Sequence, residues 1–260
     1  SADVTIMEEG HALLDRLTNG GKLPMITSCS PGWINFAEVF YPDLISHLST
    51  CKSPQQMFGA LAKTYYPSVY GVDPAKVTVV SVMPCTAKKF ESERPEMKSS
   101  GYRDVDVVIT TRELARMIKI AGLDFENLPE SDYDSIMGDS TGAAAIFGTS
   151  GGVMEAALRT VYEVVTGETL EKVDFEQVRG HQGIKKSSVT LNGKEIKLMV
   201  VNGLRNARKV MNAIRKGECD AQFIEIMCCP GGRVGVGGQP YGTSRTKLTR
   251  MDGLYKADTS

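Results

Sequence analysis

The sequence predicts an α/β domain in which short apolar strands alternate with helices. Three observations support this class. The 260 residues are enough for one large core or two smaller ones, 42% of the residues are apolar, and β-branched segments are separated by segments of helical periodicity. Charged residues make up 23% of the chain, a composition that excludes disordered and fibrous proteins.

The first half of the chain contains four predicted helices and three predicted strands. Gly20-Gly21 ends the first helix, Pro31 suits the first turn of the second, and Ser53 caps the third. Thr110 or Thr111 caps the fourth. The helices are expected at 6–17, 31–40, 54–66 and from 110 or 111 to 121, and the strands at 24–27, 77–83 and 105–109.

The second half begins with a weakly periodic stretch at 122–151, expected to fold over a site or to join two lobes. A helix then runs from Gly151-Gly152 to about residue 165. The segments 188–192 and 195–201 predict a hairpin joined at Gly193, followed by a helix at 204–216 and a strand at 223–227.

Three predicted strands end in cysteine, at Cys29, Cys85 and Cys228-Cys229. Ligands of open α/β sheets lie beyond the C-terminal strand ends, so these thiols are expected to converge there. Thiols select iron–sulfur clusters, zinc or copper(I), and the lack of any C-x-x-C pair disfavours zinc ribbons and ferredoxin-type sites. Cysteine nucleophile chemistry is also disfavoured, because no histidine lies near these strand ends in sequence; His11, His47 and His181 are interpreted as surface or core residues. Cys51 and Cys219 are interpreted as small buried apolar residues.

Charge and hydropathy exclude further classes. A formal net charge of −1 gives no argument for nucleic-acid binding, and no apolar run reaches the roughly 18–20 residues of a membrane span. Residues 181–260 nevertheless hold 14 Lys and Arg against 6 Asp and Glu. This basic third is a solvated face, a docking surface for an acidic partner or a surface covered by further polypeptide.

Two glycine-rich stretches suggest close backbone approach to a ligand. Residues 231–240 match neither a dinucleotide fingerprint nor a P-loop, and their glycines would admit a bulky ligand. Residues 148–152 either place backbone N–H groups near an anion or form a plain tight turn.

Five segments together resemble the iron-only (FeFe) hydrogenases. The three signature motifs of that family are similar to Thr27–Trp33 (TSCSPGW), Met83–Glu91 (MPCTAKKFE) and Glu225–Gly232 (EIMCCPGG); Ser53–Gln56 and Ala145–Gly148 match as well. The resemblance implies two lobes, each a small twisted, mostly parallel sheet flanked by helices, with a cleft between them. The lobes are expected at about 1–125, with part of the C-terminal end, and at 126–240. The cleft would hold the H-cluster, a 4Fe–4S cubane joined through one cysteine sulfur to a two-iron unit. The chain is expected to be a piece of a longer protein or complex, without the family's N-terminal ferredoxin-like domains.

The resemblance also implies residue roles. Cys29 matches the thiol that passes protons to the two-iron unit, and Glu9, Arg16 and Ser49 match the proton path to solvent. Lys88 matches a lysine that binds a cyanide ligand, and Cys85 and Cys229 match two cubane ligands. The pocket-wall positions are Gln55, Met83, Phe147 and Met227.

Two departures from the family pattern concern the cluster itself. Ser30 stands where the family has a cubane ligand, and Arg233 where it has the shared sulfur. Serine ligates iron only as an alkoxide, and arginine keeps its proton. The two-iron unit is therefore predicted to be absent, and a 4Fe–4S cluster would need other ligands such as Cys29 or Cys228.

Two further departures flank the site. Ala12 replaces a carboxylate of the proton path, and Val236 replaces a glycine. Two functions remain open. The first is a domain that has lost H2 chemistry and acts as a structural, regulatory or electron-transfer subunit of a larger redox complex. The second is an active ferredoxin-linked hydrogenase domain with altered cluster attachment. Ferredoxin-type or other iron–sulfur subunits are the expected partners, in the cytoplasm of an anaerobic bacterium or archaeon.

Overall fold

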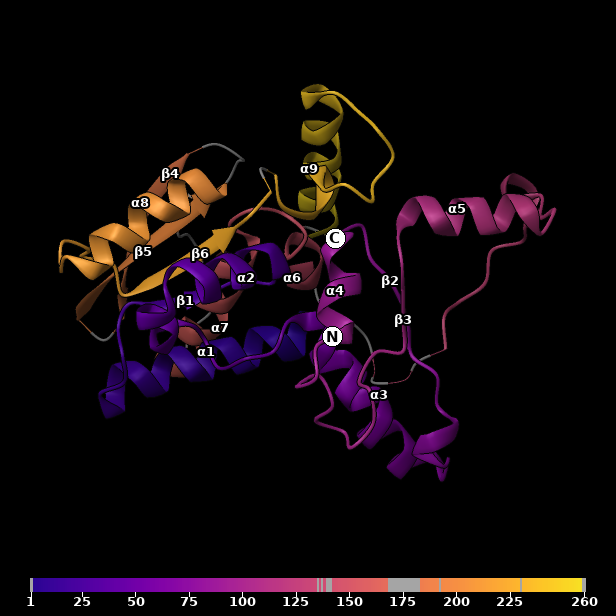
Figure 1. The fold of residues 1–260 in the computed structure, drawn as a ribbon, viewed down its shortest axis with the longest axis horizontal. Helices are drawn as coiled ribbons and strands as arrows, with labels where there is room; N and C mark the ends of the chain where they lie inside the picture. Colours follow the sequence, from indigo (N-terminus) through magenta and orange to yellow (C-terminus); the bar gives the residue numbers. More distant parts are fainter. Residues whose placement is uncertain are drawn as a thin grey trace.

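Two sheets organise the chain in a computed structural model that describes residues 2–134, 136, 138, 142–167, 183–191, 193–229 and 231–258 (Figure 1). The larger sheet has the strand order β1-β6-β5-β4, and the smaller one pairs β2 with β3. The strands of the larger sheet are β1 (Met25–Thr27), β4 (Ile184–Leu191), β5 (Lys194–Asn202) and β6 (Phe223–Met227). His181 and part of the stretch 122–151 lie outside the described residues.

Strand pairing in the larger sheet is mostly parallel, which confirms the predicted fold class. β6 runs parallel to both neighbours, so that Thr27, Glu225 and Val200 lie side by side across three strands. β4 and β5 form the predicted antiparallel hairpin. β1 belongs to the first half of the chain but pairs with β6 of the second, and the division into lobes near residue 125 stays a prediction.

Helices cover both faces of the larger sheet. On one face, α1 (Ala2–Asn19) and α7 (Gly152–Thr166) enclose a core that includes Leu13, Leu158 and Phe223. On the other face, α2 (Pro31–Phe40) and α8 (Leu204–Arg215) pack on Ile224 and Ile226, with the fully buried Trp33 at the centre. β6 is buried along its whole length because both layers cover it.

The smaller sheet consists of β2 (Val80–Val82) and β3 (Val107–Ile109), which run parallel. One face packs against α3 (Pro54–Tyr70) in a core of Ala62, Val79, Val105 and Val108. The side chains of Val80, Val82 and Val107 are exposed on this sheet. The following helix, α5 (Thr111–Ile120), buries none of its residues, and its start is fixed by a capping box between Thr110 and Glu113.

Several elements differ from the sequence-based expectations. The predicted strand at 77–83 shortens to β2, because the Asp106 carboxylate accepts a hydrogen bond from the Val79 N–H at 2.7 Å and takes the place of a strand partner. Helix α3 continues through Pro67 to Tyr70 and ends at Gly71 in the left-handed region. Three helices were not predicted, namely α4 (Ala87–Glu93), α6 (Gly142–Ile146) and α9 (Ser244–Asp258).

Short 3-10 turns complete the described fold at η1 (Pro42–His47), η2 (Pro74–Lys76), η3 (Phe125–Asn127) and η5 (Gly232–Gly235). α9 packs against α6 beside the end of the larger sheet (Figure 1). Within the described ranges, no helix combines the length and hydropathy that a membrane span requires.

Candidate functional site

The C-terminal ends of β1 and β6 lie beside each other, as the cysteine pattern predicted. Cys29 follows β1 by two residues, and Cys228-Cys229 directly follows β6. Cys85 arrives from the smaller sheet, three residues after β2, and it is close enough for its charge to oppose the lowering of the Cys228 pKa that the hydrogen bond from Cys229 causes. The structure therefore brings Cys85 towards the Cys228-Cys229 pair from a different sheet.

Cys228 and Cys229 interact with each other. The Cys229 thiol donates a hydrogen bond to the sulfur of Cys228, which lowers the pKa of Cys228 to about 7; burial opposes this shift, and the Ser30 side chain adds to it. The same hydrogen bond raises the pKa of Cys229. Gly32 keeps α2 close to this pair, since a Cβ there would lie 3.2 Å from the Cys228 sulfur. Ser30, Cys228 and Cys229 thus form one contact group.

Cys29 lies on the other side of the sheet. Its buried side chain packs with Phe147 and Met227 in a small cluster under α1 and α7, whereas Cys228 packs against the core under α2 and α8. Cluster ligation by both Cys29 and Cys228 would therefore require rearrangement of a strand end. Within the described part of the chain, no three His, Cys, Asp or Glu side chains are arranged to hold a metal ion.

Arg233 occupies the position that the resemblance gives to the shared sulfur. Its backbone N–H donates to the Gly148 carbonyl at 2.9 Å, and its guanidinium lies over the Phe147 ring, 5.5 Å from the centroid. The Nη2 atom is buried and has no hydrogen-bond partner. The segment Phe147–Gly148 therefore fixes both the backbone and the head group of Arg233.

The three residues matched to the proton path lie together. Glu9 on α1 is buried, and its carboxylate accepts hydrogen bonds from the hydroxyls of Thr27 at 2.7 Å and Ser49 at 2.8 Å. Burial raises the pKa of Glu9, while these bonds and the charge of Arg16 oppose the shift. The Arg16 guanidinium donates to the carbonyls of residues 47 and 48 at 3.2 and 2.6 Å. The geometry fits the implied path, and its role in proton transfer stays a prediction.

Cys51 borders the same acidic group. Its backbone N–H donates to the Ser49 hydroxyl at 3.1 Å. Burial, followed by the charge of Glu9, raises the pKa of the Cys51 thiol to about 11. Cys51 and Cys219 were expected to be small buried apolar residues; both are half-buried, and Cys219 packs against the core under α2 and α8.

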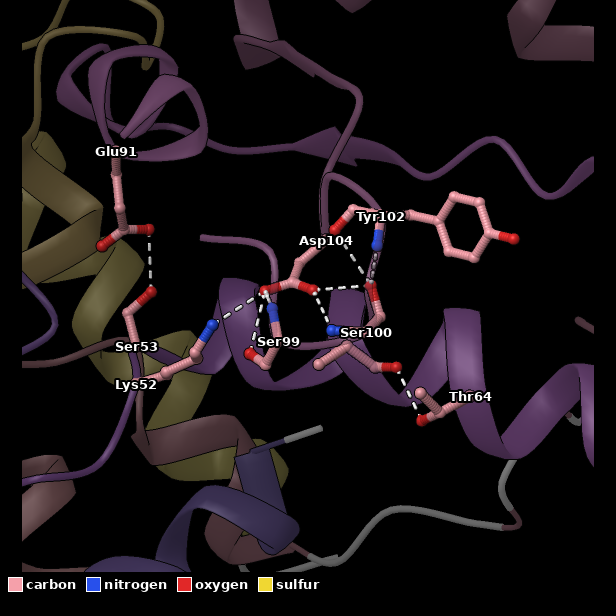
Figure 2. A network of polar contacts seen from close by, with 9 residues as sticks. Lys52, Ser53, Thr64, Glu91, Ser99, Ser100, Tyr102 and Asp104 are labelled. Atoms are coloured by element: carbon pink, nitrogen blue, oxygen red, sulfur yellow. Dashed lines mark hydrogen bonds and ion pairs between the residues drawn. The ribbon is translucent and has the colours of Figure 1, made fainter. Parts of the chain in front are cut away.

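Lys88 is buried and directed at a carboxylate of its own helix. Its ammonium donates to both oxygens of Glu91, at 2.8 and 2.9 Å. Glu91 also accepts from the Ser53 hydroxyl at 2.8 Å (Figure 2) and from the Gln55 amide at 3.3 Å. Ser53 was expected to cap α3, but its side chain makes this contact and no capping hydrogen bond. Glu91 is therefore the hub that joins Lys88 to Gln55.

A second polar hub lies next to the first, at Asp104 (Figure 2). This fully buried carboxylate accepts from Lys52 at 2.8 Å and from the backbone and hydroxyl groups of Ser99 and Ser100 at 2.8–3.2 Å. These bonds lower the pKa of Asp104 although burial opposes them. Since Lys52 precedes Ser53, the two hubs hold the chain that leads into α3.

Glu225 ties the third motif to α7. It lies fully buried at the middle of β6, and its carboxylate accepts from the backbone N–H groups of Gly151 at 2.9 Å and Met154 at 2.8 Å. Burial raises the pKa of Glu225 to about 7, and the charge of Glu9 acts in the same direction. A strand carboxylate thus caps the helix that follows the Phe147 turn.

The Ser81 hydroxyl of β2 donates a hydrogen bond to the amide oxygen of Gln55 at 2.9 Å, so Gln55 contacts the smaller sheet. Met83 is a second matched pocket residue at this sheet. It lies against the α3 core, and its N–H donates to the Ile109 carbonyl at 2.8 Å. Sequence reasoning assigned no role to Glu91, Asp104 or Glu225, although Glu91 and Glu225 stand within the matched motifs. The signal available for them was a charged residue inside an apolar or motif segment.

The donor set does not fit the H-cluster as the family attaches it. Cys85 and Cys229 are the two thiols at matching positions, Ser30 has a hydroxyl, and the cation of Arg233 repels metal ions. The guanidinium of Arg233 stacks on Phe147, so this cation lies against the matched segment Ala145–Gly148.

Sequence comparisons identify relatives over nearly the whole chain. Residues 1–237 match the family model described as iron only hydrogenase large subunit, C-terminal domain. The NADP-reducing hydrogenase subunit HndD of Solidesulfovibrio fructosivorans is 53% identical over 99% of this chain and 45% of its own length. Iron hydrogenase 1 of Clostridium pasteurianum is 51% identical over 99% of this chain and 46% of its own length. The chain spans about half the length of these relatives.

More distant relatives carry another name. The cytosolic Fe-S cluster assembly factor narfl of Xenopus tropicalis is 30% identical over 90% of this chain and 51% of its own length.

Solved structures agree with the sequence comparisons. An FeFe-hydrogenase HydA structure concerned with stepwise H-cluster assembly matches with a TM-score of 0.84 and 39% identity, over 100% of this chain and 74% of that one. The apo FeFe-hydrogenase HydA1 of Chlamydomonas reinhardtii, variant C377H, matches with a TM-score of 0.82 and 40% identity over 98% and 71% of the two chains. Together with the α/β architecture and the strand-end cysteines, these findings show that the chain belongs to the family of the iron-only hydrogenase large subunit, C-terminal domain.

Proposed function

We propose that this domain has lost the family's attachment of the H-cluster and does not interconvert protons and H2. It would act as a structural, regulatory or electron-transfer part of a larger redox complex. The observation that supports the proposal is the stack of the Arg233 guanidinium on Phe147, since Arg233 stands at the sequence position to which the resemblance assigns the shared sulfur. A guanidinium supplies no lone pair to iron.

The relatives support both loss and retention of hydrogenase chemistry. The relatives include a protein named as a cytosolic Fe-S cluster assembly factor, so not every relative of this chain is named as a hydrogenase. A partnership with iron–sulfur subunits is proposed from the relatives that are named hydrogenase subunits. The cytoplasm of an anaerobic bacterium or archaeon remains our proposal for the location.

An active hydrogenase domain is the second candidate. It is favoured by the contacts of Glu9 with Ser49 and Thr27, which give a buried acid two hydroxyl donors, one of them two residues before Cys29 in the chain. This candidate requires a 4Fe–4S cluster held by Cys85, Cys229 and at least one unconventional ligand. Cys228 is the nearer substitute, because it already contacts Cys229 and Ser30.

The test is anaerobic production of the chain together with hydrogenase maturation proteins. Iron and acid-labile sulfide are assayed, infrared spectra are searched for CO and cyanide bands, and H2 evolution is measured with a reduced viologen. We expect neither diatomic bands nor H2. Bands accompanied by H2 evolution would establish the second candidate instead.

Matched double variants separate the two departures from general damage. Ser30→Cys with Arg233→Cys restores both ligand positions and is expected to gain iron and diatomic bands. Ser30→Ala with Arg233→Ala removes the same side chains without adding sulfur and should gain neither. Equal behaviour of the two double variants would show that the thiols are not what the site lacks.

A further inference from the structure

Arg233 carries a positive charge that no carboxylate of the described residues neutralises. None of the ion pairs among them includes Arg233, and its Nη2 atom is buried without a hydrogen-bond partner. Arg233 as a whole is half-buried, but a buried donor atom such as its Nη2 normally has a hydrogen-bond partner. The side chain is also fixed, by the Gly148 carbonyl on its backbone and by the Phe147 ring under its head group.

The buried carboxylates associated with the matched motifs already have other partners. Glu225 accepts from the N–H groups of Gly151 and Met154, and Glu91 accepts from Lys88. Glu9 accepts from two hydroxyls. A rotation of any of them towards Arg233 would leave buried donors without an acceptor.

Two further unpartnered polar groups accompany Arg233. Ser150 is fully buried, and its hydroxyl has no partner; its backbone lies against Gly232, since a Cβ on Gly232 would come within 2.9 Å of the Ser150 nitrogen. Asn202 is buried with both amide atoms unpartnered, and it lies in register with Met227, which packs on Phe147. Hydroxyl and amide groups complement the N–H fork of an arginine in binding oxyanions.

We infer that Arg233 and the 147–150 turn form a binding site for a small oxyanion, at the position where the family has its shared cluster sulfur. The anion would accept from the buried guanidinium edge and from the Ser150 hydroxyl. A planar guanidinium suits carboxylate and tetrahedral oxyanions because it donates two parallel hydrogen bonds. The inference rests on the proposed function in one respect, namely that no iron cluster fills this position.

The experiment uses the full chain, assayed first for iron, and titrates it calorimetrically with sulfate and with formate at constant ionic strength. We expect saturable binding of at least one anion, weakened about tenfold or more in Arg233→Gln. Arg233→Lys keeps the charge without the fork and should bind with intermediate affinity. Arg208→Gln is the matched control: Arg208 also lies over aromatic rings, at 5.4 Å from Phe36 and 5.3 Å from Phe40, but is exposed.

Each outcome decides a different question. Iron-free protein that binds neither anion, or binds equally well in Arg233→Gln, overturns the oxyanion site and leaves the proposed function intact. Protein that carries iron with CO and cyanide bands refutes the proposed function first. Circular dichroism and thermal unfolding without added anion identify a variant that has failed to fold, in which case Arg233→Lys and Arg208→Gln are compared with the unmodified chain.

Discussion

Ser49 donates a hydrogen bond to the carboxylate of Glu9 at 2.8 Å, across 40 residues of sequence. The contact joins α1 to the segment that follows η1, and it places the Cys51 thiol within the field of the same carboxylate. The Glu9 carboxylate, the Ser49 hydroxyl and the Cys51 thiol thus share one partly buried region. A change in the charge of Glu9 therefore changes the pKa of the Cys51 thiol.

Glu9→Gln is expected to speed alkylation of Cys51. Burial and the Glu9 charge raise the pKa of this thiol to about 11, so removal of the charge increases the thiolate fraction at a given pH. Iodoacetamide labelling at pH 9, followed by mass spectrometry of the Cys51 peptide, should show an increase of about threefold or more. The Cys219 peptide from the same digest is the internal control. An unchanged Cys51 rate would show that burial alone protects it.

The free energy of unfolding is expected to fall as pH rises through neutrality. Burial raises the pKa of Glu225 from its usual 4.5 to about 7, so the folded state holds a proton that the unfolded state releases between these values. This contribution is fully present below pH 4.5 and is lost as pH rises through about 7; it amounts to about 3 kcal/mol in order of magnitude. Urea unfolding between pH 5 and 8.5 measures it, and Glu225→Gln should flatten the curve. An equal slope in the variant would assign the pH dependence to other groups.

Glu91→Gln is expected to destabilise the chain by about 3 kcal/mol, because it leaves the buried Lys88 ammonium without its counter-charge. Lys88→Met in the Glu91→Gln background should recover much of this loss. A double-mutant cycle from urea unfolding gives the coupling energy. The neighbouring Lys89–Glu113 pair is exposed and serves as the control, and its coupling is expected to be much smaller because water screens the two charges. Similar couplings for both pairs would contradict the importance of burial.

Asp104→Asn is expected to cost about 2–4 kcal/mol of unfolding free energy, since the buried carboxylate accepts from Lys52 and from two serines. Asp43→Asn removes a carboxylate that pairs with Arg215 at the surface, and it should change the free energy of unfolding much less, because water screens this pair. The comparison is made by urea unfolding at pH 7. A loss at Asp104 no larger than that at Asp43 would refute the view of Asp104 as a structural hub.

Local patterns were sufficient for much of the fold. The apolar run at Phe223–Met227 predicts both ends of β6 correctly, and Pro31 marks the start of α2. α9 escaped prediction because Ser244–Asp258 has no clear apolar stripe. β2 is shorter than its β-branched run suggests, since a side chain 27 residues away takes one of its N–H groups.

The candidate site was predictable to the extent that motifs carry it. The strand-end position of the cysteines follows from strand pattern alone, and the departures at Ser30 and Arg233 are visible in the sequence. The partners of Arg233 and Glu225 are not, because Phe147 and Gly151 lie 86 and 74 residues away, and such contacts depend on packing of the whole chain. The opposite placement of Cys29 and Cys228 likewise emerges once both strand faces are covered.

The exposed valines of the smaller sheet have a practical consequence for any solution study. Val80, Val82 and Val107 on two parallel strands are exposed to water, and helix α5 buries none of its residues, so this part of the chain presents an apolar surface. Exposed apolar surfaces of this kind promote concentration-dependent aggregation. Purification at low protein concentration, with light scattering at each step, would distinguish this non-specific aggregation from a specific oligomer.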